Sequence, residues 1–375
     1  MRWATFREVC YEELMPRVLP PKRIDQTVTP VLFSMVHTVE EGDHGKRLDV
    51  FLRSRYRKRS RENLKQAIQD GIVEITRPSE RHTPLGRIKP ATVLFAGDQI
   101  KVETARNPEP PVSFDYRILE DDGEIVVVDK PANLPVHPAG RFYLHTLLIH
   151  LKTQGRMKHV SADREFFLAH RIDKDTSGVL VLTRDGELCG KIAAQFRDRS
   201  TLKKYLAIVH GAPPASFKVD APMGRSRTSL VRIKMALRPL NDGGLEALTE
   251  FRTLKTHGPF SLVECTPKTG RQHQIRLHLA SAGYPIVGDK LYSIEDHEAV
   301  RFFDNTPAHA SHDRILSVFD RYERTSAELQ AKLILPRHAL HAHSLEFDHP
   351  VSGKRLSFVS PFPDDLVRFF DSLRG

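Results

Sequence analysis

The sequence predicts an α+β protein built from two unlike domains. At 375 residues the chain exceeds the roughly 100–200 residues of one typical domain. A proline-rich segment at 106–113 interrupts it and is predicted to link the two domains. Beyond this linker, short apolar strand patterns and helical patterns follow one another without the regular strand–helix–strand alternation of a doubly wound fold.

The composition is that of a globular protein with surplus positive charge. Hydrophobic residues make up 40% of the chain, and Lys plus Arg exceed Asp plus Glu by ten. Such a surplus favours a polyanionic partner, most simply nucleic acid, although charge alone fits a merely basic protein equally well. The three cysteines are too scattered for a zinc site or a disulfide framework.

The sequence predicts a cytoplasmic protein without membrane contact. The N-terminus lacks the apolar core of a signal peptide and carries acidic residues. No apolar run approaches the ~20 residues that a membrane-spanning helix needs.

The first predicted domain covers 37–105 and follows an extension, 1–36, to which no role is assigned. The segment 45–56 predicts a short helix, and a second helix is expected between an N-cap at Ser60 and a stop at Gly71. The β-branched segments IVEI and VLFAGDQIKVET predict strands with a Gly-Asp turn.

Positive charge is concentrated on these two helices. Nine basic residues against two acidic ones lie between Lys46 and Lys65, a local net charge of +7. Two small helices with such a cluster favour binding of RNA phosphates, with Arg47, Arg61 and Lys65 as candidate contacts. A solvated polar face explains the charge equally well.

The second predicted domain, 114–375, contains the clearest strand signals. Four apolar, β-branched segments predict central strands: 124–131, 179–184, 204–211 and 260–267. The segment 185–200 predicts an amphipathic helix, because Leu188, Ile192 and Phe196 recur every four residues. No glycine-rich nucleotide-binding fingerprint follows any of these strands.

Three polar stretches interrupt the strands of the second domain. HRIDKDTSG, 170–178, places a charged cluster directly before a strand, where charge is costly unless it is solvated or paired. Tyr205 follows two lysines at a strand start. In HQIRLHL, 273–279, polar and apolar residues alternate, which predicts a basic face opposite an apolar one. Taken singly, a charged turn, a packing tyrosine and an amphipathic surface strand or helix account for them.

In this order, the three stretches resemble the signature segments of the RluA-type RNA pseudouridine synthases. The resemblance covers roughly 115–365 and includes the flanking segments 126–138 and 337–350. The matching residues are His170-Arg171-Ile172-Asp173, Thr176-Ser177-Gly178, Lys204-Tyr205, Ala207, Val209, Gly211, Gly270-Arg271, His273-Gln274, Arg276, His278, Gly283, Pro285-Ile286, Gly288-Asp289 and Tyr292.

The first domain resembles the small RNA-binding module named after ribosomal small-subunit protein four. The usual Asn-Gly turn of that module is replaced here by TRPSERH. The matching residues are Arg47-Leu48-Asp49, Ser60-Arg61, Ile68, Gly71, Val73 and Gly97-Asp98.

The family resemblance implies a fold and a reaction. The catalytic domain is expected to hold a central, mostly antiparallel mixed β-sheet flanked by helices and loops, with a small N-terminal α/β RNA-binding domain beside it. Members of the family convert a uridine of RNA to pseudouridine, and the reaction needs neither a metal nor an organic cofactor.

The resemblance also implies roles for single residues. Asp173 is the essential carboxylate, which either attacks the ribose or removes a ribose proton. Arg276 pairs with Asp173, and Tyr205 stacks on the uracil. The substrate-binding residues are expected to be Arg171, which helps to hold the base outside the RNA stack, Ile172, which gives the base pocket an apolar wall, His170 and Arg271.

Several questions stay open at the level of sequence. Large-subunit ribosomal RNA is favoured as substrate by the N-terminal module, whereas the segment 136–146 resembles relatives that modify tRNA. A non-catalytic ribosome-assembly protein and a nucleosidase are the competing classes. The segment 293–336 is longer than in compact members and predicts a helix within 314–333. Protein partners and oligomeric state are not predicted.

Overall fold

The structure, a computed structural model, divides the chain into two compact units, Met1–Pro108 and Glu109–Gly375. The predicted linker spans this division. The residues described are 31–373, except for 57–59, 79–85, 107–108, 140–141, 155–164, 230, 232 and 295–326. Most of the predicted extension and of the long segment at 293–336 therefore lies outside the described residues, as does Cys10.

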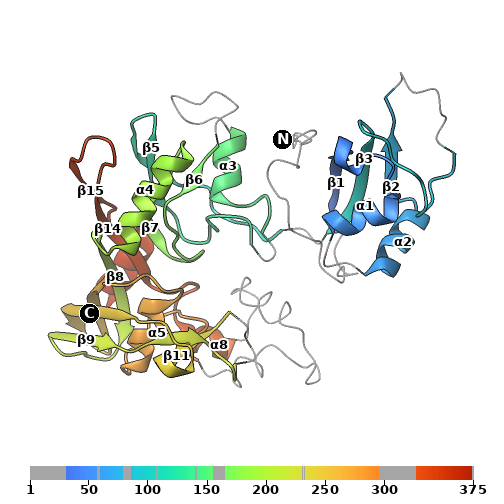
Figure 1. The fold of residues 1–375 in the computed structure, drawn as a ribbon. Helices are drawn as coiled ribbons and strands as arrows, with labels where there is room; N and C mark the ends of the chain where they lie inside the picture. Colours follow the sequence, from blue (N-terminus) through green and yellow to red (C-terminus); the bar gives the residue numbers. More distant parts are fainter. Residues whose placement is uncertain are drawn as a thin grey trace, which may run out of the picture. The chain divides into compact units, whose positions relative to one another are not determined.

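The first unit is a three-stranded antiparallel sheet packed against two helices (Figure 1). The sheet has the order β1 (Val31–Thr38), β3 (Gln99–Arg106), β2 (Val73–Thr76). The helices α1 (Leu48–Arg55) and α2 (Arg61–Gln69) share one apolar core with the sheet. A short 3-10 turn, η1 (Glu41–Asp43), precedes α1.

Local sequence patterns predicted most of these helices and strands. Both predicted helices are confirmed, and the Ser60 hydroxyl accepts a hydrogen bond from the Asn63 N–H at 3.1 Å, as an N-cap does. The last strand begins only at Gln99, because Asp98 is fully buried in the preceding turn and pairs with Arg77. β1 begins at Val31, inside the predicted extension, because its backbone pairs with β3.

The second unit is built on one ten-stranded mixed sheet. The strand order is β4-β5-β7-β14-β8-β13-β12-β9, with β15 paired to β14 and β6 to β7. β7 and β14 run parallel, and the other described pairs of this sheet are antiparallel, which confirms the predicted fold class. The strands are β4 (Arg117–Asp121), β5 (Ile125–Lys130), β6 (Phe167–Leu168), β7 (Ser177–Thr183), β8 (Leu202–His210), β9 (Ser216–Asp220), β12 (Leu248–His257), β13 (Phe260–Pro267), β14 (Leu340–Asp348) and β15 (Arg355–Val359).

Helices and a small hairpin complete this unit. The hairpin pairs β10 (Met223–Arg225) with β11 (Met235–Leu237), and a 3-10 turn, η2 (Leu240–Asp242), follows it. The helices are α3 (Leu147–Gln154), α4 (Gly186–Arg197), α5 (Gln274–Ser281), α8 (Ala327–Leu333) and α9 (Asp364–Ser372). α8 lies within the segment where a helix was predicted, and none of the helices described is long and apolar enough to cross a membrane.

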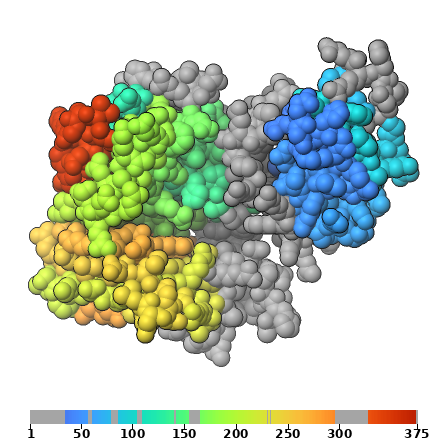
Figure 2. Space-filling model, in the orientation of Figure 1, coloured from blue at the N-terminus to red at the C-terminus, as the bar shows by residue number. Residues whose placement is uncertain are grey.

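The alternation of side chains along β5 separates two cores. Ile125 and Val127 pack with residues of α4, whereas Val126 and Val128 pack with residues of α3. The predicted amphipathic helix is thus confirmed as α4. Its Gln195 side chain exchanges two hydrogen bonds with the backbone of Asp348, which ties α4 to β14. On the face seen in Figure 2, the green segment that contains α4 lies beside the red C-terminal part of the chain.

The parallel pairing of β7 and β14 depends on a glycine. Gly178 has φ +113°, and a Cβ atom at this position would lie 2.1 Å from the backbone oxygen of Ala342. The backbones of the two strands therefore approach too closely for any other residue. This contact brings the strand that follows Asp173 beside the strand that follows His338.

Gly178→Ala should lower the free energy of unfolding by at least about 3 kcal/mol, because strain in the backbone and overlap with β14 add together. Gly190 in α4 is the matched control, since a Cβ atom there would meet no atom within 4 Å. Gly190→Ala should raise the stability by up to about 1 kcal/mol. Urea unfolding followed by circular dichroism measures both, and equal stabilities of the two variants would contradict the prediction.

Candidate active site

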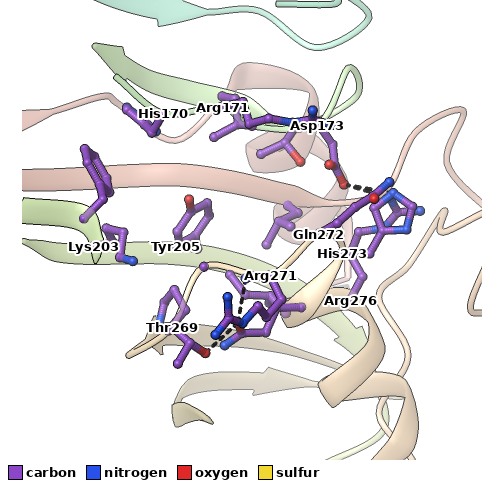
Figure 3. A pocket seen from close by; sticks show the side chains of 18 of the residues that line it. His170, Arg171, Asp173, Lys203, Tyr205, Thr269, Arg271, Gln272, His273 and Arg276 are labelled. Atoms are coloured by element: carbon purple, nitrogen blue, oxygen red, sulfur yellow. Dashed lines mark hydrogen bonds and ion pairs between the residues drawn. The ribbon is translucent and has the colours of Figure 1, made fainter. Parts of the chain in front are cut away.

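One pocket of about 620 Å³ collects the three polar stretches of the second unit (Figure 3). It opens between the loop before β7, the start of β8, and the segment that leads into α5. All seven residues predicted as catalytic or substrate-binding line it: Asp173, Tyr205, Arg276, Arg171, Ile172, His170 and Arg271. The structure therefore brings together in space what the sequence separates by up to 106 positions.

The loop that carries Asp173 is fixed from several sides. The Thr176 N–H closes a turn onto the Asp173 carbonyl at 3.1 Å, and the Thr176 hydroxyl is hydrogen-bonded to His338 Nε2 at 2.8 Å. His170 accepts a hydrogen bond from the Val181 N–H at 3.0 Å. The carboxylate is thus held on a rigid support rather than on a free loop.

Lys130 is a further support of this loop. Its side chain is fully buried at the end of β5 and donates hydrogen bonds to the carbonyls of Pro131, Leu134 and Lys174. Burial lowers the pKa of its ammonium group to about 7. Lys130 thereby joins the loop after β5 to the backbone next to Asp173.

Arg276 joins two carboxylates. Its Nε and Nη2 donate to Asp289 at 2.7 and 2.8 Å. Its Nη1 donates to Asp173 Oδ2 at 2.8 Å (Figure 3). Asp289 is fully buried and also accepts the backbone N–H groups of Leu291 and Tyr292. The bidentate pair fixes the guanidinium plane, and the remaining donor points at Asp173.

The prediction that HQIRLHL has a basic face opposite an apolar one is wrong. The segment from Gln274 forms the buried helix α5, in which polar and apolar residues alike are enclosed. Its polar side chains each find a buried partner: Gln274 bonds Thr249 and Leu248, Arg276 bonds Asp289, and His278 bonds Thr249. The polar residues are satisfied inside the fold and do not form a solvated surface.

Asp173 is an ionised carboxylate at neutral pH. Burial acts to raise the pKa of this carboxyl, but the charges of His273 and Arg276 and the hydrogen bond from Arg276 hold it well below its usual range. Burial lowers the pKa of the His273 ring to about 4, so at pH 7 the positive charge that Asp173 meets is that of Arg276. The Asp173 side chain is still 25% exposed, toward the pocket.

Tyr205 and Ile172 form an apolar side of the pocket. Tyr205 lies on β8 between Cys265 of β13 and Ala342 of β14. Burial, together with the negative charge of Asp173, raises the pKa of the Tyr205 phenol above its usual range, so the hydroxyl keeps its proton. Ile172 is buried and shares a hydrophobic cluster with Tyr205.

The other predicted substrate-binding residues differ in whether their side chains already bind to other parts of the protein. His170 stacks on Phe196 with ring centres 4.5 Å apart, and burial lowers the pKa of its ring to about 3. Because His170 is neutral and already bonded to Val181, it supports the pocket wall. Arg271 donates to the Glu246 carbonyl, whereas Arg171 is exposed at the pocket.

Four residues of this site escaped sequence reasoning. Asp289 was named only as part of the Gly288-Asp289 match to the family and was given no role, because its burial and its pairing with Arg276 appear only in the structure. Lys130 and His338 lie in the flanking segments that match the family, and His273 lies inside the third stretch. Only the pairing of distant strands and loops brings them to Asp173.

Comparisons with known proteins show which sequences this chain is similar to. The family model of RNA pseudouridylate synthases matches residues 124–281. The chain is 34% identical to the ribosomal large subunit pseudouridine synthase D of Zymomonas mobilis, over 90% of this chain and 96% of that protein. It is 32% identical to the protein of the same name from Xanthomonas campestris, over 93% and 96%.

A solved structure agrees as well. Human RNA pseudouridylate synthase domain containing 4 superposes with a TM-score of 0.50 and 28% sequence identity, over 68% of this chain and 92% of that one. Sequence and fold thus point to the same group of enzymes, as the motifs predict. The chain belongs to the RNA pseudouridine synthase family.

Proposed function

We propose that this enzyme converts a uridine of large-subunit ribosomal RNA to pseudouridine, with Asp173 as the essential carboxylate. In this reaction the bond from the ribose to N1 of uracil breaks, the base turns, and a bond forms from the same ribose carbon to C5. The proton leaves C5, and N1 gains one. The observation that carries the proposal is the Asp173 side chain, which lines a pocket and accepts a hydrogen bond from Arg276.

The chemistry requires a charged carboxylate against the sugar. Asp173 acts either by attack on the anomeric carbon or by removal of a ribose proton, and both routes need the ionised form. Arg276 keeps it ionised in a buried position, while Asp289 fixes Arg276. Tyr205, which keeps its proton, offers a flat ring for stacking on the uracil and a hydroxyl near its moving proton.

The target base must leave its stack to enter the pocket, at a cost of a few kcal/mol. Arg171 is exposed beside Asp173 and fits the role of holding the base out, because a planar guanidinium stacks on bases and binds phosphate. The remaining walls, including Ile172, His170 and Arg271, fit a role in enclosing the base.

The names of the relatives support ribosomal RNA over tRNA. Proteins from Zymomonas mobilis and Xanthomonas campestris that align with nearly the whole chain are both named for the large ribosomal subunit. We also propose that the enzyme acts in the cytoplasm, because the RNA that it is proposed to modify is ribosomal.

Mapping of pseudouridine in total RNA from cells with and without this gene tests the proposal. We expect one or a few large-subunit positions to lose the modification and to regain it when the purified enzyme is added. Loss confined to tRNA would overturn the substrate assignment. Unchanged RNA in both preparations would overturn the activity.

We further propose that the first unit binds RNA phosphates through α1 and α2. Nearby carboxylates neutralise part of the positive charge of the predicted cluster. Arg47 pairs with Asp49, while Lys46 and Arg55 both pair with Asp43. Lys65 lies 3.8 Å from Glu62, a loose contact, and Arg61 is exposed at the start of α2. Arg61 and Lys65 are therefore the stronger candidates of the three predicted contacts.

Replacing Arg61 and Lys65 by Gln should reduce the salt dependence of RNA binding. Each lost phosphate contact should lower the slope of log affinity against log salt by about 0.7–0.9. Lys101→Gln is the matched control, because Lys101 lies in the same unit and is paired with Glu74 and Glu103. Filter binding across a salt series measures the slope. An unchanged slope in the double variant would show that Arg61 and Lys65 do not contact RNA phosphates.

A further inference from the structure

His273 is a buried residue of the pocket to which the proposed function gives no role. It directly precedes α5 with a left-handed backbone, φ +56°. This conformation costs a residue other than glycine roughly 1–2 kcal/mol, although histidine adopts it more often than most. Such strain persists only where the surroundings hold it, and it gathers at functional sites.

Tyr292 is the hydrogen-bond partner of the His273 ring. The Tyr292 oxygen accepts a hydrogen bond from the Met235 N–H at 2.9 Å and lies 3.0 Å from His273 Nδ1. Burial raises the pKa of the Tyr292 phenol, so its proton stays and is available to Nδ1. A neutral imidazole that accepts at Nδ1 carries its proton on Nε2.

Nε2 of His273 faces Asp173 across the pocket. Nε2 lies 3.9 Å from Asp173 Oδ2, and the histidine side chain is only 6% exposed. Among the residues described, Nε2 has no hydrogen-bond partner, although it belongs to the wall of the pocket (Figure 3). The gap is too long for a direct hydrogen bond and leaves room for one oxygen atom bonded to both groups.

We propose that His273 binds the 2′-hydroxyl of the target ribose: Nε2–H donates to the hydroxyl oxygen, and the hydroxyl donates to Asp173. This rests on the proposed function, in which Asp173 acts at the anomeric carbon or at its neighbour. The 2′-hydroxyl is the sugar oxygen next to both positions. The contact would also let the pocket distinguish RNA from DNA at the target nucleotide, since only RNA carries this group.

Two substitutions separate this role from a structural one. The amide of Asn reaches the place of Nδ1, so His273→Asn keeps a partner for Tyr292 and tolerates the left-handed backbone but has no donor toward Asp173. The amide of Gln reaches the place of Nε2, so His273→Gln keeps the donor and gives up the bond to Tyr292. The two variants are therefore opposite in what they retain.

The test compares two synthetic oligonucleotides built around the mapped uridine. One is RNA throughout, and the other carries 2′-deoxyuridine at the target position only. Dissociation constants are measured with the full chain in an Asp173→Asn background, which blocks turnover and keeps an oxygen acceptor. With His273 present, the all-ribose oligonucleotide should bind about tenfold more tightly, as one hydrogen bond contributes at most about this factor.

In the His273→Asn variant this ratio should fall below about twofold, through weaker binding of the all-ribose oligonucleotide alone, whereas His273→Gln should keep most of it. An unchanged ratio in His273→Asn would overturn the proposal, and so would equal weakening of both oligonucleotides. The oligonucleotides follow whichever uridine is mapped, so a target outside ribosomal RNA would refute that substrate and still leave the ribose contact to be tested.

Discussion

Asp173→Asn should abolish pseudouridine formation while RNA binding stays intact. Asn keeps the shape of the side chain and an oxygen that accepts from Arg276, which lies 2.8 Å from the carboxylate. It can neither attack the ribose nor remove a proton from it. We expect the single-turnover rate to fall by at least about 10⁴-fold, as for other essential nucleophiles, with the dissociation constant for RNA changed less than about threefold.

Asp175→Asn is the matched control for this prediction. Asp175 lies two residues further on the same loop, its side chain is 18% exposed against 25% for Asp173, and its pKa is likewise lowered by neighbouring cations although burial opposes this. It is not among the residues that line the pocket. Its loss should cost stability and less than about tenfold in rate. Turnover by Asp173→Asn above about one part in a hundred would contradict the assignment.

Much of the fold could be predicted because its signals are local. The β-branched segments at 124–131 and 179–184 became β5 and β7, and the four-residue period of Leu188 and Ile192 became α4. β1 escaped prediction because its partner β3 lies some seventy residues further along the chain. The parallel contact of Gly178 with Ala342 is likewise invisible before β7 and β14 are placed together.

The site likewise has features that could be predicted from sequence and features that could not. Asp173, Tyr205 and Arg276 could be proposed because they stand inside ordered motifs, and the structure places them around one pocket. The alternation of polar and apolar residues along HQIRLHL predicted a basic surface that does not exist, because α5 buries its polar and its apolar side chains alike. Asp289 could not be recognised as the partner of Arg276 from spacing alone, since the pair forms only when the turn at Gly288 folds back toward α5.

Arg276→Gln should lower the rate by about 10²–10³-fold at pH 7, because Asp173 loses the cation that positions it and keeps it ionised. The variant should also be less stable by roughly 3–5 kcal/mol, because one partner of a buried ion pair is removed. Two carboxylates would lose their cation, Asp173 and the fully buried Asp289. Part of this loss concerns the ionisation of Asp173. Without the guanidinium, the effect of burial is opposed less strongly, which raises the pKa of the Asp173 carboxyl.

The pH dependence separates this effect from simple loss of structure. In the wild type the pKa of Asp173 lies well below its usual range, so ionisation of this group should leave the rate unchanged from pH 5 to pH 8. In Arg276→Gln the ionised fraction rises with pH. The rate should therefore recover by about tenfold for each pH unit until the raised pKa is passed. Single-turnover rates across this range, at saturating RNA, measure both profiles.

Arg337→Gln is the control that separates a loss of stability from a loss of ionised Asp173. Arg337 is a second buried arginine of the same unit, with a bidentate pair to Asp365 at 2.7 and 2.9 Å, and it does not contact Asp173. Its loss should lower stability without making the rate rise with pH. If Arg276→Gln were slowed equally at every pH, Arg276 would not act by keeping Asp173 ionised. A rise with pH in Arg276→Gln alone would instead tie the rate directly to the charge on Asp173.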